Sequence, residues 1–278
     1  MIAPHLRPDP DLLGAEWKAL VEAEYEQTER VREWREQDYY QSMTGHFVAD
    51  PNRDDDERVN LLRTYCAPDV TWLDVGAGGG RNALPLALLS QKVIAIEPSP
   101  AMRAALEESM RQYNISNVEV LDLRWPEGAT GIEVDYSLMA HVGYDIREIN
   151  PFLDALEGAT RRRCFAAMMD RAPSGGFDDL WPLIHGEERV VLPALRELIH
   201  LLMARGATPE VRIFAHGGEP FTPEHFREAA RRRLWLSEGS AKYQQLQQIL
   251  DEQLATSPQM LHTPHVVGMV SWEPQRAH

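Results

Sequence analysis

The chain has 278 residues, 44% hydrophobic and 26% charged, so it can bury a full core and is not an intrinsically disordered protein. Its 43 acidic and 28 basic residues give a formal net charge of −15, a field that repels a phosphate backbone, and we expect no nucleic-acid partner. Two cysteines, Cys66 and Cys164, cannot form a disulfide framework, which favours a reducing compartment. With no targeting segment and no apolar stretch long enough to span a bilayer, we expect a cytoplasmic protein without membrane contact.

The first predicted element is a long helix from residue 10 to about residue 40. Asp9 can cap it, Pro10 suits its first position, and apolar residues then recur at steps of three and four. Glycine, proline and an acidic run interrupt this pattern between residues 45 and 56, and the last aspartates can cap a short helix from Glu57 to about Cys66. We therefore expect residues 1–56 to form a helical cap or lid and residues 57–278 to form the main domain.

From Val70 onward, short β-branched segments alternate with helical ones. We expect strands at 70–75, 92–97, 117–123, 134–140, 164–170, 211–215 and 265–272, with helices between them. This rhythm predicts an α/β fold with a doubly wound, mostly parallel sheet and helices on both faces. Two late insertions, residues 171–192 and 217–262, the second with helices near 223–233 and 240–255, interrupt the rhythm. If they fold over the carboxyl edge of the strands they would shape a substrate pocket; the alternative is that they only cover the sheet.

A run of glycines follows the first strand: Gly76, Gly78, Gly79 and Gly80, with an apolar helix after them. Glycines let the backbone turn sharply and approach a ligand, while the first amides of the helix point toward it. A dinucleotide fingerprint counted from Gly76 ends on Arg81 and fails; counted from Gly78 it gives Gly80 and Ala83. The second count keeps a nicotinamide-dependent oxidoreductase as an alternative.

Two carboxylates flank this run. Asp74 lies just before it and would face a pyrophosphate unfavourably, so it suits a ligand with an ammonium or sulfonium charge. Glu97 ends the next strand, nineteen positions after Gly78, where a carboxylate can accept hydrogen bonds from both hydroxyls of a ribose. The spacing therefore predicts a positively charged nucleoside as ligand.

At these residues the chain resembles the class I S-adenosylmethionine-dependent methyltransferases, whose first motif, acid-x-Gly-x-Gly-x-Gly, matches Asp74, Gly76, Gly78 and Gly80. The resemblance covers about residues 70–170. It implies a Rossmann-like sheet of seven strands with the last strand antiparallel, and S-adenosylmethionine as methyl donor. It places the methionine part of the cofactor at Gly76, Ala77 and Gly78, its amino group at Asp74, its ribose at Glu97 and Pro98, its adenine near Asp122, Leu123 and Arg124, and its methyl group near Ala140 and His141.

The residues that would handle the methyl acceptor carry no motif. His141 is the candidate base, because an imidazole titrates near neutral pH, and Tyr144 could orient the acceptor. Tyr39, Tyr40 and His46, in a cluster with Phe47, could form a lid over the cofactor, although core packing explains such a cluster too. The histidine pairs of the chain have no third ligand, so we expect no metal. We expect a small-molecule acceptor; a nucleoside-binding protein without catalysis is the second alternative, and the oligomeric state stays open.

Overall fold

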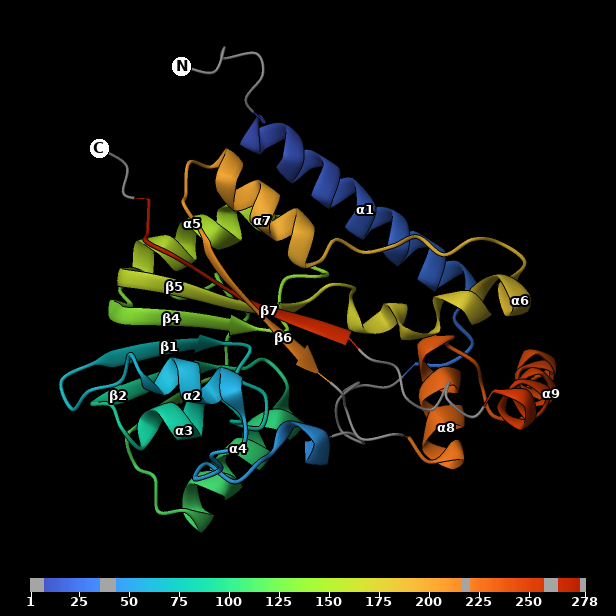
Figure 1. The fold of residues 1–278 in the computed structure, drawn as a ribbon, viewed down its shortest axis with the longest axis horizontal. Coiled ribbons are helices and arrows are strands. Elements are labelled where there is room, and N and C mark those ends of the chain that lie inside the picture. The colour runs from blue at the N-terminus through green and yellow to red at the C-terminus, as the bar shows by residue number, and fades with distance from the viewer. Residues whose placement is uncertain (1–7, 36–43, 217–220, 258–264, 276–278) are drawn as a thin grey trace.

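The computed structural model describes residues 8–35, 44–216, 221–257 and 265–275, and these form a mixed sheet of seven strands (Figure 1). The spatial order is β3-β2-β1-β4-β5-β7-β6. The strands are β1 (Thr71–Val75), β2 (Lys92–Ile96), β3 (Val118–Leu121), β4 (Val134–Ala140), β5 (Thr160–Met169), β6 (Glu210–His216) and β7 (His265–Trp272). Only β7 runs antiparallel to its neighbours β5 and β6. The predicted mostly parallel, seven-stranded sheet is confirmed, with its one reversed strand at the position that the resemblance implies.

Helices cover both faces of the sheet. One face carries α2 (Glu57–Arg63), α3 (Ala83–Ala87) and α4 (Pro100–Gln112), packed on a core that includes Trp72, Leu106 and Phe165. The other face carries α5 (Ile149–Ala159) and α7 (Leu195–Ala204), packed on a core that includes Leu73 and Phe152. Apolar surface is thus buried on both sides of each central strand, which is why these strands read as nearly continuous apolar runs.

Helix α1 (Pro10–Val31) forms a further layer, because it packs on the outside of α5 and α7. Asp9 caps it by accepting a hydrogen bond from the Asp11 amide, as predicted, and the Trp17 indole donates to the Ile146 carbonyl at 3.0 Å. The helix ends at Val31, well before residue 40, because Arg32 takes an extended conformation (ψ 122°). The predicted length of this helix was therefore wrong.

The arginine triplet 161–163 also differs from the prediction. It lies just before the strand predicted at 164–170, so the sequence predicted no strand at these three residues. In the structure α5 ends at Ala159 and β5 begins at Thr160, so all three arginines belong to the strand. Each forms an ion pair with a neighbouring acid, Glu133, Asp135 or Glu210, and these local pairs offset the low strand preference of the run.

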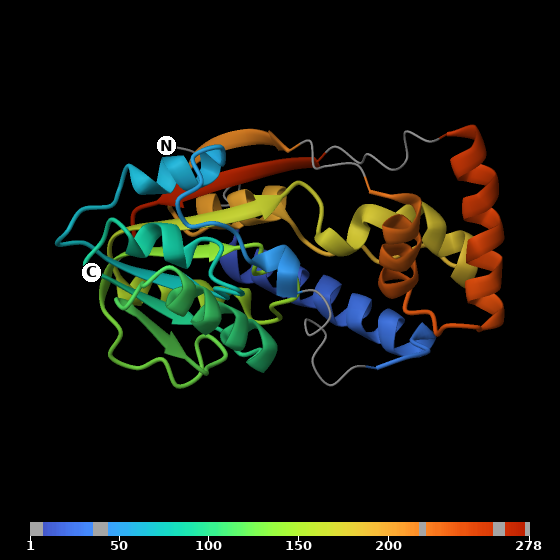
Figure 2. The same cartoon turned by 90° about the horizontal axis from the view of Figure 1, so that it is seen from below.

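The two late insertions form one helical lobe with its own hydrophobic core. The lobe consists of η3 (Pro173–Leu180), α6 (Trp181–His185), α8 (Pro223–Arg233) and α9 (Ala241–Thr256), whose shared core includes Phe177, Trp181, Phe226, Leu246 and Leu250. Figure 2 shows it beyond one end of the sheet, with α1 running alongside the sheet and reaching the lobe. The helices predicted near 223–233 and 240–255 are confirmed. In the described ranges, no helix is long and apolar enough to cross a membrane.

Candidate functional site

The glycine turn between β1 and α3 has a backbone conformation that requires glycine at three positions. Gly76, Gly78 and Gly80 have φ values of 72°, 56° and 86°, in the left-handed region that other residues rarely adopt. The amides of Gly76 and Ala77 both donate to the Ile96 carbonyl, at 2.8 and 3.0 Å, which ties the turn to the end of β2. The turn is therefore a fixed, side-chain-free surface at the carboxyl edge of the sheet.

Glu97 faces this turn from the end of β2. Its side chain is buried, and its two oxygens accept hydrogen bonds from the amides of Gly78 and Ser99, both at 2.8 Å. The carboxylate thus links the glycine turn to the start of α4. The structure brings Glu97 and Gly78 together as the sequence spacing predicted.

Asp74 lies buried on β1 beside Glu97, with 1% of its surface exposed. In the described part of the chain neither of its oxygens makes a hydrogen bond of normal geometry. Burial, and then the charge of Glu97, raise the pKa of Asp74 to about 7, against a smaller opposing effect of the Ala83 amide. Ionising a buried carboxyl without hydrogen-bond partners, next to a second carboxylate, has a free-energy cost that a bound cation would offset.

A segment from the amino-terminal part covers the glycine turn, and we call residues 44–53 the strap. It begins with the short helix η2 (Thr44–Phe47), and a Cβ atom on Gly79 would lie 2.9 Å from both the Phe47 carbonyl oxygen and Val48 Cγ2. Arg53 at its other end donates to the Arg81 carbonyl at 2.8 Å. The φ of Gly79 is not positive, so its backbone conformation does not require glycine. Glycine is needed here because the strap comes too close to leave room for a side chain.

Sequence reasoning did not find the Phe47–Gly79 contact. The candidate lid residues Tyr39 and Tyr40 lie outside the described residues, and so does the side chain of His46, whose backbone belongs to η2. The proposed lid role of these three side chains therefore stays a prediction.

The expected adenine side lies after β3. Asp122 is exposed there and pairs with Arg103 at 2.8 Å, and Arg103 also donates to the Glu97 carbonyl at 2.9 Å. Leu123 is half-buried, and Arg124 is exposed. Asp122 and the Glu97 carbonyl thus share one arginine at the same edge of the sheet. The adenine contact of Asp122, Leu123 and Arg124 stays a prediction.

The end of β4 touches the glycine turn. A Cβ atom on Gly76 would lie 2.4 Å from Val142 Cγ2, which places the residues after Ala140 against the turn. His141 is exposed, has a φ of 57°, and places its Nδ1 atom 3.4 Å from the Tyr144 hydroxyl. Such a strained backbone at a strand end is typical of functional sites.

Tyr144 connects the segment after β4 to the end of β5. Its hydroxyl accepts a hydrogen bond from the Met169 amide at 2.7 Å, and the residue is 5% exposed. Burial raises the pKa of Tyr144 far above its usual value, so the phenol keeps its proton. Tyr144 therefore joins the ends of β4 and β5 next to His141.

Side chains that could ligate a metal do not gather here. In the described ranges no three His, Cys, Asp or Glu residues form a group able to hold a metal ion. His185 contacts the Leu234 carbonyl and Lys242, and Glu187 pairs with Arg30.

Comparisons with known proteins agree with this geometry. Residues 73–162, which include the glycine turn, Glu97 and His141, match the family described as "Methyltransferase domain". The fold is similar to that of the YcgJ protein of Bacillus subtilis, at 13% identity and a TM-score of 0.56 over 79% of this chain and 99% of that one. It is also similar to magnesium protoporphyrin IX methyltransferase of Synechocystis PCC 6803 with bound S-adenosylhomocysteine, at 12% identity and a TM-score of 0.50 over 94% and 99% of the two chains.

A curated relative matches a shorter part. A probable ribosomal RNA small subunit methyltransferase A of Methanosphaera stadtmanae is 32% identical over 69 residues, which are 24% of this chain and 26% of that protein. Residues 73–162 therefore match a methyltransferase domain, within a fold similar to those of the two solved structures. This match favours S-adenosylmethionine over the nicotinamide alternative.

Proposed function

We propose that the protein transfers the methyl group of S-adenosylmethionine to a small-molecule acceptor held between the carboxyl edge of the sheet and the helical lobe. The observation that carries this proposal is the buried, unpartnered carboxylate of Asp74 beside Glu97 at the glycine turn. When bound, S-adenosylmethionine supplies a methyl group already activated by its positively charged sulfur. The protein then has to bind, orient and shield the reactants.

Each cofactor residue has a separate task in this proposal. Glu97 accepts hydrogen bonds from the ribose hydroxyls, and Asp74 neutralises the ammonium group. The turn from Gly76 to Gly78, with Ala77 between, lies along the methionine part, and the strap closes the site above Gly79. The two carboxylates disfavour a pyrophosphate at this place.

His141 is the proposed base for an acceptor that must lose a proton. If Nδ1–H donates to the Tyr144 oxygen, Nε2 is the atom that accepts the proton from an alcohol or phenol. Tyr144 is a positioning residue here, because its own oxygen is held by the Met169 amide. An acceptor amine that arrives neutral needs no base, and His141 then only lines the site.

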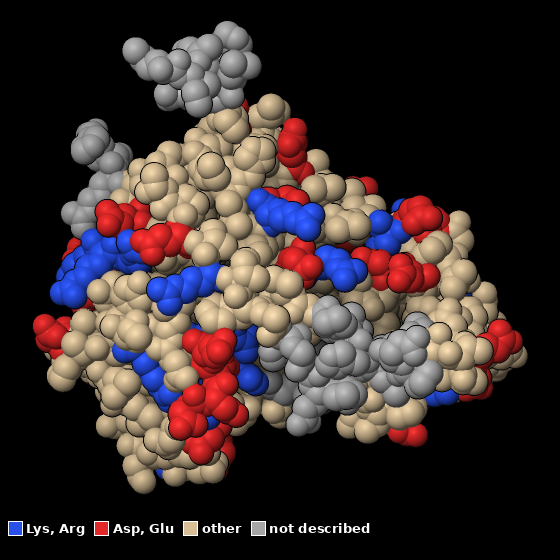
Figure 3. Space-filling model, in the orientation of Figure 1, with Lys and Arg blue, Asp and Glu red and all other residues tan. Residues whose placement is uncertain are grey.

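A small acceptor is favoured over RNA by the distribution of charge. All three arginines from 161 to 163 pair with acids, Arg231 pairs with Glu228, and the Arg232 guanidinium lies 5.0 Å from the Trp34 ring. On the face seen in Figure 3, basic side chains alternate with acidic ones and form no continuous track. Sequence-independent RNA binding needs such a track.

The cofactor half of the proposal is tested by calorimetry with S-adenosylmethionine and S-adenosylhomocysteine. We expect micromolar affinity for the wild-type protein and a loss of roughly 100-fold for Glu97→Ala, because two charged hydrogen bonds are removed. Glu133→Ala, an exposed acid on the opposite edge, is the matched control and should bind normally. Absence of binding to folded wild-type protein would falsify the proposal.

The catalytic half is tested by screening small alcohols, phenols and amines with radiolabelled methyl donor. Labelled product supports transfer and excludes a purely nucleoside-binding protein. For a hydroxyl acceptor, His141→Ala should reduce kcat roughly 100-fold, within the range of general base catalysis, with cofactor affinity unchanged. Labelled RNA in place of a small product would overturn the choice of acceptor.

A further inference from the structure

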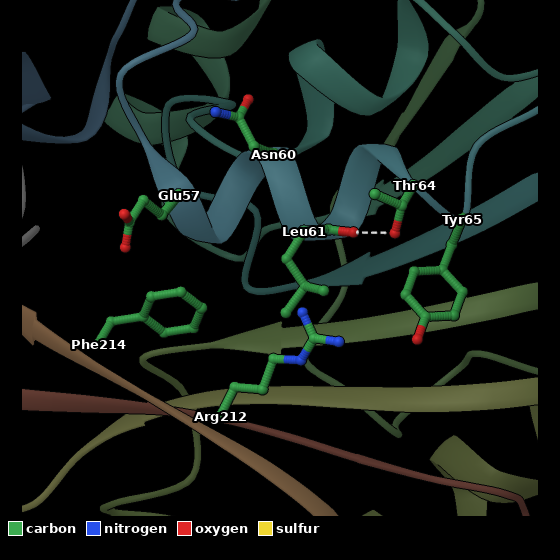
Figure 4. A pocket seen from close by; sticks show the side chains of 7 residues that line it. All are labelled: Glu57, Asn60, Leu61, Thr64, Tyr65, Arg212 and Phe214. Atoms are coloured by element: carbon green, nitrogen blue, oxygen red, sulfur yellow. Dashed lines mark hydrogen bonds between the residues drawn. The ribbon is translucent and has the colours of Figure 1, made fainter.

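A cavity of about 410 Å³ lies between helix α2 and the edge strand β6, away from the cofactor site (Figure 4). Strands β4, β5 and β7 separate β6 from β1, which carries the glycine turn. None of the residues assigned to cofactor or acceptor lines this cavity. Its walls are formed by Glu57, Asn60, Leu61, Thr64, Tyr65, Arg212 and Phe214.

Two polar groups of the cavity form no hydrogen bond within the described part of the chain, although each interacts electrostatically with a neighbouring charge, Arg212 with Glu210 and Tyr65 with Arg163. The Arg212 side chain rises from β6 to a place below Leu61, and the Tyr65 side chain comes from the turn after α2 (Figure 4). Within the described part of the chain, the Arg212 guanidinium makes no hydrogen bond or ion pair, and the Tyr65 hydroxyl makes no hydrogen bond. Five guanidinium donors and one phenol are thus available to a ligand.

The ring of Tyr65 is held firmly in place. It makes edge contacts with Tyr136 and Phe165, at centroid distances of 5.6 and 4.9 Å. Its hydroxyl therefore stands at a fixed position, because turning the ring would break two aromatic contacts. A preorganised donor of this kind loses little entropy when a ligand binds.

The charges around the cavity leave Arg212 able to hold an anion. Glu210, two residues earlier on β6, is paired with Arg163 at 2.7 Å, and its interaction with the charge of Arg212 is weaker. Glu57 and Tyr65 lie at opposite ends of the cavity, with Arg212 between them (Figure 4). An anion bound between Arg212 and Tyr65 therefore lies away from Glu57.

The apolar walls complete the requirements for a ligand. Phe214 and Leu61 flank Arg212 and offer a flat hydrophobic surface. The exposed apolar side chains of β6, Val211 and Ile213, alternate with Arg212 and Phe214 and so belong to the other face of the strand. A protein docking on apolar surface would use that other face, whereas this cavity has the mixed lining of a small-molecule site.

We propose that the cavity between α2 and β6 is a second small-molecule site, and that it binds a carboxylic acid with a flat apolar body. The carboxylate takes two parallel hydrogen bonds from the Arg212 guanidinium and one from the Tyr65 hydroxyl. The body rests on Phe214 and Leu61. The volume of the cavity lies within the range typical of ligand sites, roughly 300–1,000 Å³.

The experiment titrates the full-length protein with 3-phenylpropanoate by calorimetry, and 3-phenylpropanamide serves as the uncharged analogue. We expect the acid to bind at least about tenfold more tightly than the amide, because only the acid forms charge-assisted hydrogen bonds. Arg212→Met should weaken acid binding at least about tenfold, and Tyr65→Phe roughly threefold to tenfold. Arg196→Met, which removes an exposed arginine from α7, is the control and should change nothing.

Several results would overturn the proposal. They are equal affinity for acid and amide, unchanged affinity in Arg212→Met, or no saturable binding up to about 10 mM acid, the weak limit of a specific site. Competition between the acid and S-adenosylmethionine would also overturn it, since it would place the acid at the cofactor turn. Cofactor binding by each variant shows that the variant is folded, and it keeps failure of this site distinct from failure of the proposed methyl transfer.

Discussion

The cofactor half of the sheet and the helical lobe are built in opposite ways. In the cofactor half, Asp74, the glycine turn and Glu97 lie within one stretch of 24 residues, and the Glu97–Gly78 hydrogen bond joins residues nineteen apart. In the lobe, the η3–α6 segment and α8–α9 come from two distant parts of the chain, and the end of α1, from a third part, packs against their shared core. The cofactor site is therefore encoded locally, whereas the proposed acceptor side depends on long-range packing.

One buried arginine shows how the lobe depends on distant partners. Arg189 follows α6, its side chain is 4% exposed, and it donates to the Ser174 carbonyl at 2.8 Å. It also pairs with Glu24 of α1 at 3.4 Å and with Asp178 of η3 at 3.6 Å, and it lies 4.5 Å from the Trp181 ring. The Gln27 side chain of α1 forms hydrogen bonds with the backbone of the residues directly before and after Arg189.

The largest expected effect comes from removing this arginine. Arg189→Met should lower the free energy of unfolding by about 3 kcal/mol, because Glu24 and Asp178 lose the charge that compensates their burial. Denaturant unfolding measures the loss, and calorimetry should show unchanged affinity for S-adenosylmethionine. Arg30→Met is the control, since it removes an exposed ion pair between the same regions and should cost about 0.5 kcal/mol or less. A large loss of cofactor affinity in Arg189→Met would break the contrast between the two regions.

The contact of the strap with the glycine turn gives the next effect. Gly79→Ala adds a Cβ atom 2.9 Å from the Phe47 carbonyl, so the strap must move, and we expect cofactor affinity to fall roughly tenfold to 100-fold, a change of about 1.4–2.7 kcal/mol. Gly158→Ala in α5 is the matched control, because its new Cβ atom meets nothing within 4 Å. Equal affinities of the two variants would mean that the strap has no part in the site.

The smallest expected effect concerns pH. Asp74 has a raised pKa of about 7, so it is largely protonated at pH 6 and must lose its proton to hold an ammonium group. Its ionised fraction rises from roughly 10% to 90% between pH 6 and pH 8, and cofactor affinity should rise about tenfold with it. Calorimetry across this range measures the slope, and Asp74→Asn should flatten it. A slope that survives in Asp74→Asn would assign the titration to another group.

Local signals account for what the sequence could predict. The strand at 265–272 and the helix cap at Asp9 follow from composition and capping chemistry within a few residues, and both are confirmed. The same local reasoning predicted a mostly parallel sheet but could not identify β7 as the antiparallel strand, because α8 and α9, which precede it, belong to the lobe and form no crossover on the sheet. The resemblance to the family was needed to expect that reversal.

The candidate site divides in the same way. Asp74, Gly78 and Glu97 could be found because one turn and one strand end bring them together. The approach of Phe47 to Gly79 and the Arg53–Arg81 hydrogen bond depend on how a distant segment folds back. Their one signal in the sequence is Gly79 itself, a glycine more than the turn geometry requires.

The position of β7 determines the order in which the strands of the sheet can pair during synthesis on the ribosome. Among the described strands β6 pairs only with β7, and β7 fills the place between β5 and β6. While residues 265–272 are still being synthesised, strands β1 to β5 can already assemble, but β5 presents an open hydrogen-bonding edge. The nascent chain therefore passes through a stage in which its glycine turn is complete while the β5 edge of its sheet is still unpaired.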